Sequence, residues 1–356
     1  MLEKLPERLA IFCAIPRGGH AINKPVAWVL GALAIFGVVG CGAAFAQKSG
    51  PASAPAAPVS DSFPAWAYPW APDFKVPPDN GGATHVPDSS ASFTVTQERD
   101  LFFVPDWHPG DHAPMADIVA RGRRPDVRAC GSCHRAEGTG GPENASLAGL
   151  SAAYIAQQMA DFKSGARKFA GPQEGPVLTM IAIAKAATDA EVRAAAEYFS
   201  ALKPKSVINV VETDTVPVTQ IARFFYTAVA NGGTEPIGRR IVEVPVDLEQ
   251  FEHRDSRSRF TAYVPIGSLA KGEALAKTGR SGTTIPCAGC HGPGLNGIGA
   301  IPGIAGRSPS YIVRQIYNFQ QQARNGSAGA LMAPVVEKLS HDDMIALAAY
   351  VSSLRP

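Results

Sequence analysis

Two copies of one short cysteine motif constrain this chain more than any other feature of its sequence. Residues 130–134 (CGSCH) and 287–291 (CAGCH) both read C-x-x-C-H, and the two copies begin 157 residues apart. This pattern is the attachment signature of c-type haem, because two thiols add to two vinyl groups on one edge of the porphyrin and the adjacent histidine then faces the iron. The motifs therefore predict two covalently bound haem c groups, attached through Cys130, Cys133, Cys287 and Cys290, with His134 and His291 as axial iron ligands.

Zinc is the competing interpretation of the same cysteines. A tetrahedral zinc site needs only four thiolates, which two C-x-x-C pairs supply. The histidine after each pair and the predicted export of the chain speak against zinc. Six cysteines in 356 residues are also too sparse for a disulfide scaffold.

An internal repeat surrounds the two motifs. Tyr154 and Tyr311 each follow the first cysteine of their motif by 24 residues, and Arg167 and Arg324 each follow their tyrosine by thirteen. Each copy closes with a similar segment, AEYFSAL in one and AAYVSSL in the other. The chain thus contains two copies of one module, which we call module 1 (101–203) and module 2 (267–356).

The repeat also predicts the sixth iron ligands. Met180 lies 18 residues before Tyr198, and Met332 lies 18 residues before Tyr350. Among the six methionines of the chain, no other two hold equivalent places in both copies. A single methionine in an apolar stretch is usually a packing residue, but the matched positions indicate axial ligands. A thioether opposite a histidine is typical of electron-transfer haems and raises the reduction potential.

The N-terminal residues predict export. Residues 1–24 carry a basic excess, and 26–46 contain no charge over 21 residues, enough for a helix to cross a hydrocarbon core of ~30 Å. The basic excess predicts that the N-terminus stays in the cytoplasm while the rest is exported. Residues 25–46 then form a cleaved signal peptide ending in A-F-A, a lipoprotein signal modified at Cys41, or an uncleaved membrane anchor. All three place the remainder in the periplasm, tethered to or associated with the inner membrane.

Two further segments lie outside the repeat. Residues 47–100 are rich in Pro, Ala and Gly and are expected to form a linker or an arm along the surface. Its Trp66, Tyr68 and Trp70 either fix the arm to the body or form a docking epitope. Residues 204–266 show period-two stretches of Val, Ile and Thr, which predict a few β-strands between the modules.

These motifs together resemble the dihaem class I cytochromes c, and the modules are similar to those of the cytochrome c4 type. The resemblance covers about 101–203 and 267–356. It implies a mainly α fold of two tandem class I cytochrome c domains, here with a small β-containing insert between them. In that family each module has an N-terminal helix, the C-x-x-C-H motif, further helices, a Met loop and a C-terminal helix.

The resemblance also implies a haem environment. The backbone carbonyl of Pro302 would receive the ring N–H of His291, a contact that orients an iron ligand. Module 1 has Ala145 at that place, whose carbonyl could still serve. Arg167 and Arg324 would pair with haem propionates, or would instead be solvated. The residues placed in the haem environment are Tyr154, Tyr311, Arg167, Arg324 and Pro302.

Helix signals support this placement. Apolar residues recur every three to four positions in the closing segments, and Ser or Thr precedes several of the segments. The expected helices are 115–120, 151–163, 189–202, 268–277, 309–321 and 340–354.

We expect an exported dihaem cytochrome that transfers single electrons between respiratory partners. The donor would be a periplasmic dehydrogenase and the acceptor an oxidase or a soluble cytochrome. A net charge of +2, from 33 basic and 31 acidic residues, argues against a nucleic-acid partner. The alternatives are a dihaem oxidoreductase acting on thiosulfate or peroxide, and a fixed cytochrome subunit of a dehydrogenase. His108 and His112 are expected to be surface residues rather than metal ligands.

Overall fold

The computed structural model describes residues 63–76, 78–171 and 175–356. The predicted leader or anchor at 25–46 lies outside them. Within the described ranges, no helix combines the length and the apolar character needed to cross a membrane.

Module 1 is built from helices that begin at the predicted signals. Thr188 caps the closing helix α6 and forms a capping box with Glu191, so that both side chains satisfy backbone N–H groups of the first turn. Ser151 accepts a hydrogen bond from the N–H of Tyr154 at the start of α4. The helices are α2 (Asp117–Ala120), α3 (Gly131–His134), α4 (Ala152–Ser164), α5 (Pro176–Ala186) and α6 (Asp189–Ala201).

Module 2 repeats this order with a longer opening helix. Ser340 begins the closing helix with a capping box to Asp343, at the place that Thr188 and Glu191 hold in module 1. The elements are α8 (Ser268–Thr278), α9 (Ala288–His291), α10 (Pro309–Gln320), the 3-10 helix η3 (Gly329–Met332), α11 (Ala333–Val336) and α12 (His341–Ser353).

The six expected helices are confirmed, with ends displaced by a residue or two. The implied Met loops are wrong as loops, because module 1 has the helix α5 there and module 2 has η3 followed by α11. Pro176 opens α5 in the first turn, where its missing N–H costs no hydrogen bond. Pro334 is the second residue of α11, also within the first turn.

The turn that precedes each C-x-x-C-H motif has the same backbone conformation in both modules. Gly122 and Gly279 both have left-handed backbone conformations, with φ of +63° and +69°. A Cβ on Gly122 would lie 2.2 Å from the carbonyl oxygen of Val127, and one on Gly279 would lie 2.2 Å from that of Thr284. Both glycines are therefore required by close backbone contact.

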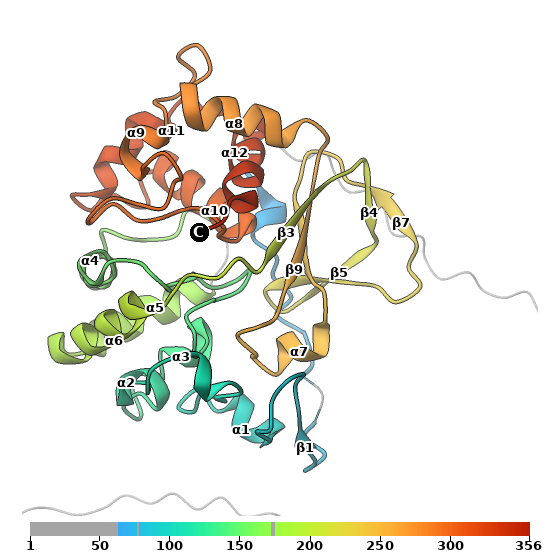
Figure 1. The fold of residues 1–356 in the computed structure, drawn as a ribbon, viewed down its shortest axis with the longest axis vertical. Helices are drawn as coiled ribbons and strands as arrows, with labels where there is room; N and C mark the ends of the chain where they lie inside the picture. The colour runs from blue at the N-terminus through green and yellow to red at the C-terminus, as the bar shows by residue number, and fades with distance from the viewer. Residues whose placement is uncertain (1–62, 77, 172–174) are drawn as a thin grey trace, which may run out of the picture. The chain divides into compact units, whose positions relative to one another are not determined.

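The insert between the modules contains the predicted strands. A three-stranded sheet has the order β3–β9–β8, with β3 parallel and β8 antiparallel to β9, and two short hairpin-like pairs flank it (Figure 1). The strands are β3 (Ile208–Glu212), β4 (Thr215–Pro217), β5 (Thr219–Ala222), β6 (Phe225–Ala228), β7 (Thr234–Pro236), β8 (Val242–Pro245) and β9 (Phe260–Val264), and one helix, α7 (Leu248–Glu252), lies between β8 and β9.

The segment before module 1 packs against both modules and the insert. Trp66 and Tyr68 are buried in the core of module 2, which confirms that aromatic residues fix this arm to the body. The indole N–H of Trp66 donates to Nε2 of His341 at the start of α12. The segment also contains η1 (Ala65–Ala67), β1 (Ala83–Thr84), β2 (Phe93–Thr94) and α1 (Val95–Arg99), and the 3-10 helix η2 (Pro109–Asp111) follows at the start of module 1.

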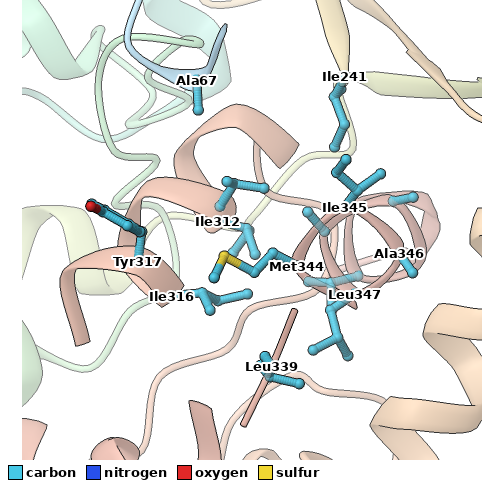
Figure 2. Packing of buried hydrophobic residues seen from close by; sticks show 14 of the residues in the cluster. Ala67, Ile241, Ile312, Ile316, Tyr317, Leu339, Met344, Ile345, Ala346 and Leu347 are labelled. Carbon is cyan, nitrogen blue, oxygen red and sulfur yellow. The ribbon is translucent and has the colours of Figure 1, made fainter. Parts of the chain in front are cut away.

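The apolar core of module 2 lies mainly between α10 and α12. Figure 2 shows Ile312, Ile316 and Met344 in contact there, with Ala67 of the arm and Ile241 of the insert at its edge. The opening helix α8 packs very closely on α12. A Cβ on Gly272 of α8 would lie 2.0 Å from the carbonyl oxygen of Ala346, so only glycine fits this crossing.

Candidate functional site

The two C-x-x-C-H motifs adopt the same local structure. In each, the first cysteine precedes a one-turn helix, α3 or α9, which ends at the histidine. None of the four cysteines forms a disulfide. Burial raises the pKa of Cys130 to about 12 and that of Cys287 to about 11, so both thiols are neutral before they react.

The histidine of each motif is oriented by a backbone carbonyl. Nδ1 of His134 lies 2.8 Å from the carbonyl oxygen of Ala145, and Nδ1 of His291 lies 2.8 Å from that of Pro302. The protonated Nδ1 donates in each case, which leaves Nε2 as the unprotonated nitrogen. Burial lowers the pKa of both imidazoles and favours this neutral form.

These groups fit haem c and do not fit zinc. Within the described ranges, no group of three or more His, Cys, Asp or Glu side chains is gathered as a metal cluster. A site shared by the four cysteines is therefore excluded there. A thiol pair followed by an oriented neutral histidine is instead present in each module, and this donor set suits a porphyrin attached at one edge.

The two repeat-matched methionines lie on different local structures. Met180 is half-buried in the middle of α5, whereas Met332 ends η3 and packs against the core of module 2. Their surroundings differ accordingly, and their assignment as iron ligands rests on the repeat.

Arg167 and Arg324 join the two modules at an almost symmetric contact. Their backbones pair as an antiparallel bridge. Arg167 donates to the hydroxyl of Tyr311 and to Gln315, and Arg324 donates to the hydroxyl of Tyr154 and to Gln158. Each arginine thus bonds across the module boundary to the tyrosine of the opposite module.

The same arginines are held from within their own modules. The guanidinium of Arg167 lies 4.4 Å from the ring centroid of Phe162, and that of Arg324 lies 4.2 Å from that of Phe319. Arg324 is buried, so the alternative of a solvated side chain does not hold for it. Burial, followed by the charge of Arg167, lowers the pKa of Arg324.

Three other residues of this junction escaped the sequence reasoning. Gln158 and Gln315 accept hydrogen bonds from both arginines. Their equivalence was readable, because each lies four residues after its tyrosine. Arg307 donates to Ser146 of module 1 and has no arginine counterpart, since Leu150 stands at the equivalent place. No sequence signal pointed to it.

The expectation that His108 and His112 are surface residues is wrong. The imidazole of His108 is buried, and its Nε2 lies 3.1 Å from Oδ1 of Asp255 in the insert. The imidazole of His112 lies between Asp106 and Tyr198. A hydrogen bond with Asp106 raises the pKa of His112. His108 therefore connects module 1 to the insert, whereas His112 joins two segments of module 1.

Comparison with known proteins identifies the repeat. The sequence model described as Cytochrome c matches residues 119–203 and 269–355, which lie within the two modules. A cytochrome c-554(548) of Halomonas halodenitrificans is 37% identical over 82 residues, which are 23% of this chain and 96% of that protein.

Two further relatives match over longer stretches. A thiosulfate dehydrogenase electron acceptor of Thiomonas intermedia is 28% identical over 234 residues, which are 64% of this chain and 80% of that protein. A cytochrome c4 of Azotobacter vinelandii is 30% identical over 138 residues, which are 35% of this chain and 65% of that protein.

Proposed function

The chain belongs to the cytochrome c family, and from that membership we propose that it is an exported carrier of single electrons between a periplasmic dehydrogenase and an oxidase or soluble cytochrome. Its two cytochrome c modules carry two covalently bound haem c groups, and its function is electron transfer. The haem supplies the one-electron chemistry, while the protein supplies attachment, orientation and potential.

In this proposal each module ligates its own iron. His134 and His291 bind through Nε2, because Nδ1 is engaged by a backbone carbonyl in both modules. Met180 and Met332 would supply a thioether to the iron of their own module. Cys130 and Cys133 in module 1, and their counterparts in module 2, form the covalent bonds.

The observation that carries the proposal is the completeness of both modules. Each has a thiol pair, a histidine oriented by a carbonyl at 2.8 Å, and a methionine at the matched position. Both modules therefore have a candidate sixth ligand, whereas an enzyme with an open iron site would lack one in at least one module. This supports an electron carrier over the thiosulfate- or peroxide-type oxidoreductase, because outer-sphere transfer requires no bond cleavage at the iron.

Contact between the modules supports internal transfer of electrons. Arg167 and Arg324 bond to the opposite tyrosines and stack on their own phenylalanines, so the junction is rigid and polar. A guanidinium at this place is also suited to a haem propionate, since planar N–H forks match carboxylates. The two modules then form one relay.

Export is supported by the sequence alone. Residues 26–46 are uncharged and follow a basic region, which fits translocation of the modules into the periplasm. A retained or lipidated segment would keep the protein at the inner membrane.

A second candidate is a fixed electron-accepting subunit of a dehydrogenase. It is favoured by the similarity to proteins named thiosulfate dehydrogenase electron acceptor, which extends over 80% of one of them. The chemistry at the irons would be unchanged. Native purification distinguishes the two, because a subunit would co-purify with its dehydrogenase without crosslinking and a free carrier would not.

Optical spectroscopy of the haem-loaded protein and of single methionine variants tests the axial ligands. Wild type should contain two haems, show the far-red band of ferric Met–iron coordination for both, and bind no carbon monoxide when reduced. Met180→Ala and Met332→Ala should each remove about half of the band and admit carbon monoxide to one module. Met159→Ala is the matched control. The counterpart of Met159 in module 2 is Ile316, which cannot bind iron, so this variant should leave the band intact.

Carbon monoxide binding by the wild type would contradict the carrier assignment and favour the oxidoreductase. A full far-red band in either ligand variant would instead reject that methionine alone.

A further inference from the structure

The two carbonyl oxygens that orient the motif histidines lie in equivalent loops. Ala145 and Pro302 occupy matching positions in the repeat, and each accepts a hydrogen bond from the histidine Nδ1 of its own module at 2.8 Å. We call residues 145–150 and 302–307 the carbonyl loops. Because these bonds orient the imidazoles, the position of each carbonyl loop determines where its histidine ring points.

Backbone hydrogen bonds fix the two carbonyl loops in the same way. In each loop two successive N–H groups donate to one carbonyl oxygen, that of Gly138 in module 1 and that of Leu295 in module 2. The N–H of Gly149 then donates to a carbonyl oxygen of α6, and that of Gly306 donates to one of α12. All these bonds stay within one module, so they cannot set one carbonyl loop relative to the other.

The side chain at the last position of the loops differs between the modules. Module 1 has Leu150 there, which is buried in its apolar core. Module 2 has Arg307, which is also buried, with 8% of its surface exposed. The hydroxyl of Ser352 donates to the backbone carbonyl oxygen of Arg307 at 2.6 Å, which holds this residue against α12. A buried guanidinium needs hydrogen-bond acceptors in place of water.

The acceptors of this guanidinium are carbonyl oxygens of both loops. Nε of Arg307 donates to the carbonyl oxygen of Gly303 in its own loop at 2.6 Å. One terminal nitrogen donates to the carbonyl oxygen of Ser146 in the loop of module 1, also at 2.6 Å, and the other lies 3.5 Å from that of Ala148. One planar guanidinium therefore crosses the module boundary and holds both carbonyl loops.

The two short bonds are made to equivalent residues. Ser146 and Gly303 hold the same place in the repeat, and each directly follows the residue whose carbonyl accepts from the histidine. The peptide next to each histidine acceptor is thus bonded to the same side chain. Because the guanidinium is a rigid fork, it fixes the direction of these bonds as well as their length.

We propose that Arg307 is a positioning residue for the axial histidines of both modules. It holds the two carbonyl loops at one spacing, so that His134 and His291 keep their Nδ1–H bonds and present Nε2 in a fixed orientation. A side chain of module 2 thereby positions a ligand of module 1. This inference rests on the proposed function, since it requires that both histidines bind iron. Contacts beyond the ligands commonly set ligand orientation and the properties of the metal.

Proton exchange at the two histidine rings tests this role. The haem-loaded full chain is prepared with isotope-labelled histidine, and NMR follows the exchange with solvent of the two Nδ1–H protons, identified by their shifts in the ferric protein. Arg307→Leu introduces the residue that module 1 has at this place. It should accelerate exchange of both protons about tenfold, equivalent to ~1.4 kcal/mol. Acceleration at only one histidine, or at neither, would overturn the inference.

Arg314→Leu provides the control for a weakened junction. Arg314 lies on α10 and is half-buried, and its guanidinium also crosses the module boundary. Its acceptors are the carbonyl oxygens of Ala67 and Pro142, which lie outside both carbonyl loops. This substitution removes a cation and a contact between the modules, and it should leave both Nδ1–H exchange rates unchanged. Equal acceleration in the two leucine variants would overturn the specific role of Arg307.

Arg307→Lys separates the charge from the fork. Lysine keeps the cation but lacks the planar fork that holds Ser146 and Gly303 together, so exchange of both protons should remain faster than in the wild type. Wild-type exchange rates in this variant would assign the effect to charge alone and overturn the inference. The wild type tests the premise separately. If ferric iron shifted neither histidine signal, the axial ligation of the proposed function would be rejected instead.

Discussion

Modules 1 and 2 share one sequence pattern but complete their cores differently. Module 2 fills the space between α10 and α12 with large apolar side chains and with Trp66 of the arm. Module 1 leaves a groove of about 420 Å³ along α4, α5 and α6. Alanines line this groove where module 2 has larger residues. The equivalent pairs include Ala156 and Val313, Ala184 and Val336, and Ala187 and Leu339.

The comparison shows that a repeated module does not need a repeated core. Module 2 is stabilised by apolar packing with the arm and with the insert. Module 1 is joined to its neighbours mainly by polar contacts, such as those of Arg135, Arg254 and His108. The local signals that form the helices are common to both modules, while the surrounding chain determines how each is buried.

The largest expected effect is the loss of a core side chain from module 2. Leu339→Ala should lower the free energy of unfolding by about 3 kcal/mol, because Leu339 is buried in the core and its removal leaves a cavity. Ala187→Leu, the reverse change at the equivalent place of module 1, should alter stability by less than about 1 kcal/mol, because the groove accepts the added carbons. Urea unfolding of the haem-loaded protein measures both.

Leu178→Ala is the control for this pair. Leu178 lies on α5 and is exposed, so its truncation should change stability by no more than about 0.5 kcal/mol. A large loss of stability from Ala187→Leu would mean that the groove is rigid and that the two cores are more alike than their residues suggest.

The junction of the modules gives the next effect. Arg324→Ala should cost about 2–3 kcal/mol, because Tyr154 loses its donor and Gln158 and Gln315 keep only the hydrogen bonds from Arg167. Arg167→Ala should cost less, since Arg167 is only half-buried. The double variant should cost less than the sum, because both arginines share the two glutamines.

Additive losses in this double-mutant cycle, measured by urea unfolding, would show that the two arginines act independently. Equal losses of unfolding free energy from Arg324→Ala and Arg167→Ala would show that the deeper burial of Arg324 adds no stability.

Much of the fold was readable from the sequence because its signals are local. The caps at Ser151, Thr188 and Ser340 and the spacing of apolar residues predicted the helices that the structure shows. The C-x-x-C-H motifs are also local, since all their functional groups lie within five residues. The period-two pattern of 204–266 predicted strands, and the structure confirms them.

Contacts between distant segments were not readable. Arg254 reaches Ser132 across 122 residues of sequence, and His108 faces Asp255 across 147, so neither contact has a short spacing to detect. Arg167 and Arg324 were placed beside the haem by resemblance, but their bonds to the opposite tyrosines depend on how two modules meet. Such pairings arise only after folding brings the segments together.

The smallest expected effect concerns an acidic residue at the start of each closing helix. Hydrogen bonds from Arg123, then from the backbone of Thr188, lower the pKa of Glu191 from 4.5 to about 2. A folded-state pKa below the unfolded value stabilises the protein above pH 4.5, and this stabilisation is lost as the pH falls towards 2. Glu191→Gln should therefore cost about 1 kcal/mol at pH 7, limited by the partial exposure of Arg123, and almost nothing at pH 2.

Asp343 of module 2 makes the matched comparison. Burial alone would raise its pKa, but hydrogen bonds from Lys271 and Ser340 lower the pKa overall. Asp343→Asn should therefore also destabilise the protein at neutral pH, and this loss of stability should diminish as the pH falls. Unfolding free energies measured from pH 7 down to pH 2 test both variants. If the cost of Glu191→Gln stayed constant over that range, its carboxylate would act through helix capping alone, and the charge pair with Arg123 would contribute nothing to module 1.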